Sequence, residues 1–439
     1  MLVLAPIELF FFIIYQKSVG IPFSSDWEIL PFVMSLEGTE QIHDKLALFI
    51  PPSSEHHLTP AKLVFSVAKI FNPMLNIKTA LLLSNSLLLG LFILFVMLIP
   101  RKHEGLILPA TIAWILFQMQ HWALMSHSAE AAQYFSIIVF AGWAFYFVNH
   151  HLSLAITGSF FFGGLSMLGS NTGILVMIVL GIHFLQHHKR ILAVTLCSGA
   201  AFLIILSILY FGAPDIVSSV GDILRHPVSY LYHFFSFIGA TLSIDNAYFG
   251  WFAPWGGLTA IIYFIILTRN KFYLTNPAIY YFMLFIILVA CSEASLLVSD
   301  NSTHALDSKY RIFSTSFLIL IVLTIAVKLS SEDISAKTRF SCYTLFVAVL
   351  LNLASYYSNI TNIELRSKQL TSAMQTVIME DAPVKTGRQE DPQKSQILQL
   401  ALNKYFYKLP CRDIFSKSDF KSLMLSPTTK PGHYCREAH

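Results

Sequence analysis

Charged residues are scarce in this chain of 439 residues. Asp, Glu, Lys and Arg make up 12% of it, as 29 basic and 25 acidic residues. A soluble domain carries about 25% charged residues, so half of the usual solvating charge is missing. The net charge of +4 is small and spread along the chain, so nothing points to a nucleic-acid partner. The shortage of charge excludes an ordinary soluble enzyme.

Cysteines and nucleotide-binding motifs are also few. Of five cysteines, Cys197, Cys291 and Cys342 fall in or at the ends of apolar runs and are expected to be packing residues. Cys411 and Cys435 would form a disulfide in an oxidising periplasm, the alternative being two free thiols. The chain has no Walker A loop, no GxSxG and no Rossmann glycine pattern. An ATP-driven pump and an α/β-hydrolase are therefore unsupported.

Long apolar runs are what the sequence has instead. Hydrophobic residues make up 55% of it, and repeated runs of roughly 18–20 residues match the ~30 Å hydrocarbon core of a bilayer. We therefore predict an all-α polytopic membrane protein with about 11 transmembrane helices. The expected spans are Leu2–Tyr15, Thr79–Ile99, Leu106–Met119, Tyr134–Val148, Leu152–Leu168, Gly173–Leu185, Ile191–Phe211, Trp251–Thr268, Pro277–Val298, Ile312–Val327 and Phe340–Tyr357.

Basic residues in the short loops predict the orientation. They gather on one side of the spans, at Arg101, Lys102, Lys189, Arg190, Arg269, Lys271, Lys328, Lys337 and Arg339. The positive-inside rule makes this side cytoplasmic. We therefore expect a cytoplasmic N-terminus, a transmembrane domain over residues 1–357 and a periplasmic tail or cap over residues 358–439.

The first outer loop, residues 20–78, holds two segments with helical periodicity, Thr39–Phe49 and Thr59–Phe71. Lys62 and Lys69 share one face of the second segment, and apolar residues form the other. This pattern is typical of a helix that lies in the membrane interface. The alternative is an amphipathic loop helix with no substrate role.

Two carboxylates follow the first span, at the depth where lipid headgroups meet water. Asp26 and Glu28 flank Trp27, and partial burial could raise the pKa of a carboxyl enough for it to act as a general base. The alternative is that Asp26 caps a following helix and Glu28 is solvated. Glu55, His56 and His57, ahead of Lys62, could grip a phosphate. Consecutive loop residues rarely share a metal ion, so we assign no metal ligands and no cofactor, and leave a divalent cation open.

Further polar groups lie at the outer ends of the spans. Arg225, Lys309 and Arg311 could neutralise a phosphate leaving group, since Arg binds phosphate through two parallel hydrogen bonds. The alternative is that such cations are snorkelling anchors. Because acidic groups near membrane depth usually face protein or water, Glu130 and Glu293 are expected to line a common cavity. His127, Trp27 and Glu55 are assigned to the same cavity.

Several ordered segments together resemble a family of bacterial and phage multi-spanning glycosyltransferases of the GT-C type that modify surface polysaccharide such as O-antigen. They are Asp26–Glu28 with Pro31, Glu55–Lys62, Phe117–Trp122, Gly169–Gly173, His226–Pro227 with Phe237–Ala240, and Ser308–Ser314. The family favours Glu-His-Arg and Ser-Arg-Tyr where this chain has Glu55–His57 and Ser308–Tyr310. Since Lys is a point charge rather than a planar fork, a phosphate grip here would depend more on Arg311.

The resemblance implies an enzyme of the bacterial inner membrane with its site on the periplasmic face. It would transfer a hexose such as glucose from a polyprenyl-phosphate carrier to a lipid-linked or polymeric glycan, with Asp26 or Glu28 as base and membrane lipids as neighbours. Two alternatives stay open. A flippase or transporter would move a lipid-linked oligosaccharide without chemistry, and a polymerase or ligase would join whole repeat units.

Overall fold

The computed structural model describes residues 1–49, 58–72, 74–100, 105–187, 199, 221, 223–244, 250–299, 307–329, 334–380, 385–386, 389–390, 392–403, 407 and 410–414. Some predictions fall elsewhere in the chain. Those on Glu55, His56, His57, Cys197 and Cys435 lie outside the described residues, as does the expected span Ile191–Phe211 except for residue 199.

Helices make up nearly all of the described chain. Its first half contains α1 (Leu4–Lys17), α2 (Asp26–Gly38), α3 (Ile42–Phe49), α4 (Thr59–Phe71), α5 (Ile77–Met97), α6 (Ile107–Leu116), η1 (Met119–His121), α7 (Trp122–Met125), α8 (Ser128–Phe147), α9 (Leu152–Met167), η2 (Asn171–Gly173) and α10 (Ile174–Gln186). Its second half contains α13 (Pro227–Gly239), η3 (Ala240–Leu242), α15 (Phe252–Arg269), α16 (Phe272–Thr275), α17 (Pro277–Ser299), α18 (Arg311–Leu329), α19 (Ile334–Glu380), α20 (Pro392–Asn403) and α21 (Cys411–Ile414). The strands β1 (Lys385–Thr386) and β2 (Gln389–Glu390) form a short antiparallel pair.

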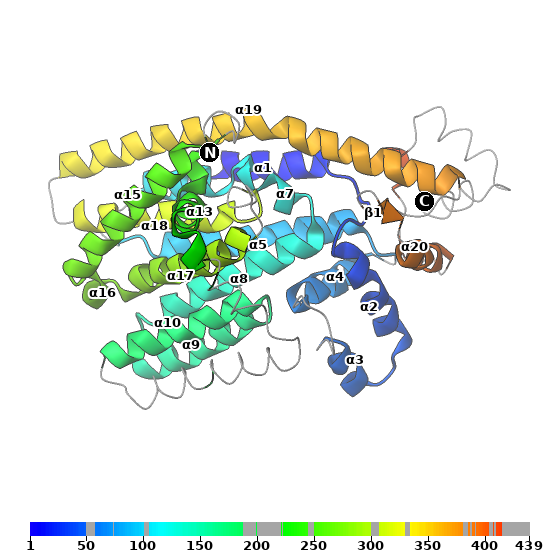
Figure 1. Ribbon diagram of the computed structural model, residues 1–439, viewed down its shortest axis with the longest axis horizontal. Coiled ribbons are helices and arrows are strands. Elements are labelled where there is room, and N and C mark those ends of the chain that lie inside the picture. Colours follow the sequence, from blue (N-terminus) through cyan, green and yellow to red (C-terminus); the bar gives the residue numbers. More distant parts are fainter. Residues whose placement is uncertain are drawn as a thin grey trace.

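The long helices lie side by side across Figure 1, with α19 along the top of the view. Among the described helices, α5, α15, α17, α18 and the stretch Ala336–Ile378 of α19 are long and apolar enough to cross a membrane, and α9 and α10 are shorter apolar helices. These helices confirm the predicted class, an all-α membrane protein. The count of about 11 spans stays a prediction.

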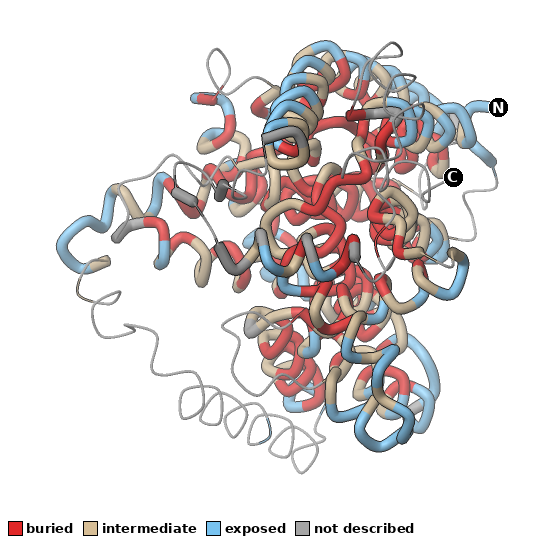
Figure 2. The backbone as a smooth tube through the Cα atoms, turned by 90° about the vertical axis from the view of Figure 1, so that its right-hand side faces the viewer, coloured by how far each residue is buried: buried red, intermediate tan, exposed pale blue. Residues whose placement is uncertain are grey.

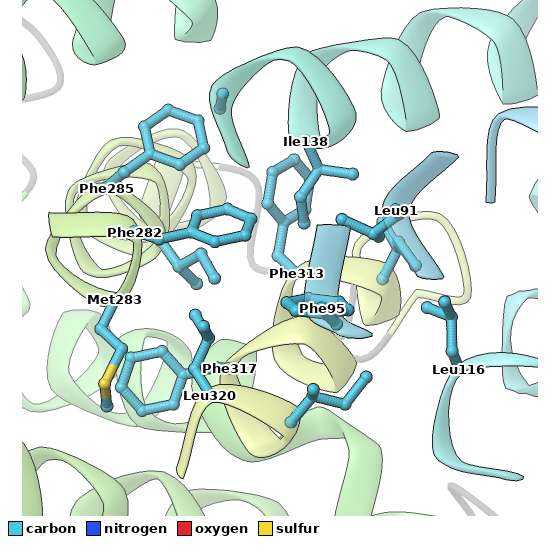
Figure 3. Packing of buried hydrophobic residues seen from close by; sticks show 14 of the residues in the cluster. Leu91, Phe95, Leu116, Ile138, Phe282, Met283, Phe285, Phe313, Phe317 and Leu320 are labelled. Carbon is cyan, nitrogen blue, oxygen red and sulfur yellow. The ribbon is translucent and has the colours of Figure 1, made fainter. Parts of the chain in front are cut away.

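The main core lies where α5, α8, α17 and α18 meet. Figure 2 shows the buried residues concentrated inside the bundle, and Figure 3 shows the aromatic centre of this core. Phe95 of α5 stacks on Phe282 of α17 with ring centroids 6.0 Å apart. In lipid, close packing holds helices together more than removal from water does. Gly142 of α8 serves this packing, because a Cβ there would overlap Leu94 and Phe282.

A second core lies at the end of the bundle that carries α2, α4 and α20, on the right of Figure 1. It joins Trp27 of α2, Phe65 of α4 and Leu398 of α20. Tyr407 donates a hydrogen bond to the carbonyl oxygen of Gly20 at 2.5 Å. The C-terminal helices therefore pack against the first outer loop.

The described cysteines differ in their oxidation state. Cys411, buried in this second core, is disulfide-bonded, whereas Cys291 and Cys342 are free thiols. Because Cys435 lies outside the described residues, its pairing with Cys411 stays a prediction.

Three helices bear directly on the sequence predictions. The range of α4 coincides with the predicted helix Thr59–Phe71, and α3 covers most of Thr39–Phe49. The last predicted span, Phe340–Tyr357, is part of the 47-residue helix α19, which continues to Glu380. The expected boundary between residues 357 and 358 therefore lies inside one continuous helix.

Candidate functional site

Two neighbouring hollows lie where the first outer loop, the η1–α7 segment, the start of α18 and α19 approach one another. The first, here called the polar cavity, has a volume of about 540 Å³ and is lined by Trp122, Ala123, His127, Glu130, Ile244, Asp307, Ser308, Lys309, Arg311, Ser358, Asn359, Asn362 and Arg366. The second, the apolar groove, has about 500 Å³ and is lined by Ile21, Pro22, Phe23, Trp27, Trp122, Asn362, Leu365, Arg366, Gln369, Leu370, Ala373, Met374 and Val377. They share Trp122, Asn362 and Arg366, so the two hollows adjoin.

Asp26 joins the first outer loop to the start of α8. Its carboxylate accepts hydrogen bonds from the backbone N–H of Ala129 at 2.8 Å and of Phe23 at 3.2 Å, and from the Ser128 hydroxyl at 3.3 Å. It therefore occupies the place of an N-cap for a helix distant in sequence. Asp26 is only 1% exposed. Burial raises its pKa to about 7, although these hydrogen bonds act in the opposite direction.

His127 and Glu130 form a dyad at the start of α8. His127 Nδ1 lies 3.0 Å from Glu130 Oε2, and the Ser24 hydroxyl donates to Glu130 Oε1 at 2.8 Å. Burial lowers the pKa of His127 in spite of the carboxylate beside it. Burial alone would raise the pKa of Glu130, but the His127 and Ser24 hydrogen bonds and nearby positive charge lower it to about 2. Burial therefore favours the neutral imidazole, and the hydrogen bonds favour the ionised carboxylate.

Three cations and two carboxylates line the polar cavity, so its formal charge is positive. Arg311 is the first residue of α18 and is 4% exposed. Arg366 comes from α19, and its guanidinium lies 4.4 Å from the ring centroid of Phe23 and 5.7 Å from that of Trp122. These cation–π contacts place a charge at the junction between the polar cavity and the apolar groove.

Hydrogen bonds between distant segments hold the cavity wall together. The Ser308 hydroxyl donates to the carbonyl oxygen of Gln120 at 2.6 Å and accepts from the N–H of Ala123 at 3.0 Å. Beneath them, the Thr241 N–H donates to the Ser314 hydroxyl at 2.9 Å. Lys309 and Arg311 follow Ser308 directly, so the wall that carries them is fixed to the η1–α7 segment.

The predicted site residues divide into three groups. His127, Glu130, Lys309 and Arg311 line the polar cavity, and Trp27 lines the apolar groove. Glu293 shares a hydrogen bond with Tyr310 next to Lys309 but does not line either hollow. Asp26, Glu28, Lys62 and Arg225 are also absent from both linings.

These last three residues have other environments. Glu28 and Arg225 are exposed. Lys62 donates to the carbonyl oxygen of Leu48 at 2.8 Å and lies over the Phe32 ring. Lys62 therefore ties α4 to α3. The interpretation of Glu28 as a solvated carboxylate, given above as the alternative, fits its exposure.

Sequence reasoning missed the contribution of α19. Asn359, Asn362 and Arg366 line the polar cavity and lie three and four residues apart, a spacing that puts side chains on one face of a helix. That spacing is visible in the sequence. These three residues, however, fall in the predicted tail, residues 358–439, where we expected no helix.

Comparison of the chain with protein-family models, with curated proteins and with solved structures finds no match. Across the part of the chain that the structure describes, no group of three or more His, Cys, Asp and Glu side chains could hold a metal ion. The hollows are therefore interpreted from their own chemistry.

Proposed function

We propose that this chain is a glycosyltransferase of the bacterial inner membrane that transfers a hexose, such as glucose, from a polyprenyl-phosphate carrier to O-antigen or a related glycan at the periplasmic face. The observation that carries the proposal is the junction of a cationic cavity with an apolar groove. A polyprenyl-phosphate sugar has the same two parts, an anionic head and an apolar chain.

The cavity chemistry fits the leaving group of this reaction. A sugar phosphodiester carries one negative charge, and its cleavage releases a phosphate monoester with nearly two. Lys309, Arg311 and Arg366 would bind the product charge more strongly than the substrate charge, which is the kind of interaction that accelerates a reaction. The N-terminus of α18, where Arg311 lies, adds backbone N–H groups and a favourable dipole.

The groove would take the first isoprene units of the carrier. Its lining includes Ile21, Leu370, Met374 and Val377. Because it meets the cavity at Arg366, a lipid in the groove would present its phosphate to the three cations. Positioning and charge neutralisation then supply most of what the transfer needs.

The test is transfer by the purified protein in lipid nanodiscs, with a polyprenyl-phosphate hexose and isolated glycan acceptor. We expect release of polyprenyl phosphate and a mass gain of one hexose per glycan repeat. Arg366→Gln should lower kcat about 10²–10³-fold, the effect of removing one charge-stabilising donor. The matched control is Arg269→Gln at the far end of α15, which should keep the wild-type rate.

Three results would contradict the proposal. Movement of the lipid-linked sugar across the bilayer with no polyprenyl phosphate released would indicate a flippase. Joined repeat units would indicate a polymerase or ligase. Equal rates for the Arg366 and Arg269 variants would show that the cavity does not hold the phosphate.

A further inference from the structure

We propose that His127 accepts the proton of the acceptor hydroxyl through Nε2, and that Glu130 is the positioning residue that holds the imidazole for this step. The inference rests on the proposed glycosyl transfer and names its base. It differs from the sequence-based expectation, which gave this role to Asp26 or Glu28.

The surroundings of the imidazole carry the inference. The side chain lines the polar cavity, and Nδ1 is held by Glu130 at 3.0 Å. Nε2 is buried and has no hydrogen-bond partner among the described residues. A carboxylate that holds Nδ1–H fixes the tautomer whose Nε2 carries a lone pair. A buried nitrogen without a partner is costly, and a substrate hydroxyl would satisfy it.

The carboxylates proposed from the sequence suit the role less well. Asp26 already accepts three hydrogen bonds from the Phe23 and Ala129 N–H groups and the Ser128 hydroxyl. It is absent from the linings of both hollows, as is the exposed Glu28. Asp26 instead anchors the start of α8, which carries the dyad.

Phe23 and Arg366 lie next to the imidazole. The centroid of the Phe23 ring lies 4.5 Å from that of the His127 ring, with the two ring planes at 34°. The Arg366 guanidinium lies over the Phe23 ring, 4.4 Å from its centroid.

The transfer forms one bond and breaks one bond at the anomeric carbon. The oxygen of the acceptor hydroxyl forms a bond to the anomeric carbon while its proton passes to His127 Nε2. The bond between the anomeric carbon and the phosphate oxygen breaks, and its electron pair leaves on the phosphate, which Lys309, Arg311 and Arg366 neutralise. The imidazolium formed is stabilised by Glu130 and later returns its proton to water.

The experiment compares three single variants of the full chain in nanodiscs. His127→Asn keeps a donor toward Glu130 but removes the basic nitrogen, and we expect kcat to fall about 10²–10⁴-fold with donor binding retained. His233→Asn is the matched control, because His233 is also a buried histidine but lines neither hollow. It should keep the wild-type rate. Glu130→Gln keeps the shape of the dyad and removes its charge.

The pH profile separates catalysis from a structural role. Since the imidazole must be neutral to accept the proton, kcat should rise as the pH rises through the pKa of His127. This rising part of the profile is called the acidic limb below. The charged groups that act on the imidazole are Glu130 and Arg366 of α19. Lys309 and Asp26 interact in turn with Glu130. Losing the Glu130 carboxylate should lower the imidazole pKa and move the limb to lower pH. The limb should persist in Asp26→Asn, because Asp26 is not the titrating base.

Each result has a defined meaning. A His127→Asn rate within threefold of wild type overturns the inference but leaves the proposed function standing. A limb that stays in place in Glu130→Gln, or disappears in Asp26→Asn, also overturns it. A wild-type protein that binds donor but transfers nothing overturns the proposed function itself. If His127→Asn fails to fold, the shift of the limb in Glu130→Gln still decides.

Discussion

The buried carboxyl of Asp26 should make the stability of the protein fall as the pH rises. Its ordinary pKa is 3.8, and burial raises the value to about 7 in the folded chain. Between these two values the folded state holds a proton that the unfolded state has released. Stability contributed by this group is therefore complete below pH 3.8 and is lost as the pH rises to about 7.

The shift sets the size of the effect. A difference of ~3 pKa units corresponds to roughly 4 kcal/mol, at about 1.4 kcal/mol for each unit. Other groups contribute in the opposite sense, since the lowered pKa of Glu130 makes stability rise with pH below its ordinary value. The effect of Asp26 is therefore isolated by comparison with Asp26→Asn, which cannot titrate.

The assay is denaturant unfolding of both proteins in the same detergent, followed by tryptophan fluorescence from pH 4 to pH 7.5. We expect the wild type to lose roughly 3 kcal/mol more than Asp26→Asn between pH 4 and pH 7, since the folded carboxyl is still half protonated at pH 7. In Asp26→Asn the hydrogen bonds from residue 26 to the start of α8 are changed at every pH. This change shifts the free energy of unfolding by the same amount at every pH and does not alter its slope against pH. Parallel stability curves for the two proteins would refute the reasoning.

Three more outcomes are expected. Leu370→Gln in the apolar groove should raise the KM of a long-chain donor about tenfold, from the ~1.5 kcal/mol of lost apolar burial, and leave a short-chain donor unaffected; steady-state kinetics with both donors checks this. Gly257→Ala should destabilise the protein by about 1–3 kcal/mol, because the new Cβ overlaps a backbone carbonyl of α13, whereas Gly164→Ala meets nothing within 4 Å and should match wild type in thermal unfolding. Peptide mapping without reductant should find Cys411 linked to Cys435, and a link to any other cysteine would contradict the prediction.

Helices with a regular spacing of apolar residues could be predicted from the sequence. The alternation of apolar and polar residues over Thr59–Phe71 repeats every three to four residues, and α4 has those bounds. The end of α19 was not predictable from hydropathy, because the apolar run stops near Tyr357 while the helix continues to Glu380. The better signal was the lack of any Pro or Gly from residue 334 to residue 380, which leaves the helix nothing to break it.

The candidate site was predictable only in part for a related reason. His127, Glu130, Lys309 and Arg311 stood out because charge at the outer end of an apolar run is unusual. Arg366 lies in a polar stretch, where charge is ordinary and draws no attention. Only the packing of α19 against the η1–α7 segment brings Arg366 to the cavity.

The length of α19 gives the site a dependence on the thickness of the surrounding bilayer. At 1.5 Å per residue, its 47 residues span about 70 Å, more than twice a ~30 Å hydrocarbon core. Arg366 lies roughly 14 Å along the same rod beyond Tyr357. A thinner or thicker membrane shifts or tilts such a helix to match its apolar length. If α19 spans the bilayer with its apolar part, the depth of the cavity cation would therefore change with hydrophobic mismatch, and the proposed lipid-linked transfer would depend on the acyl-chain length of the membrane.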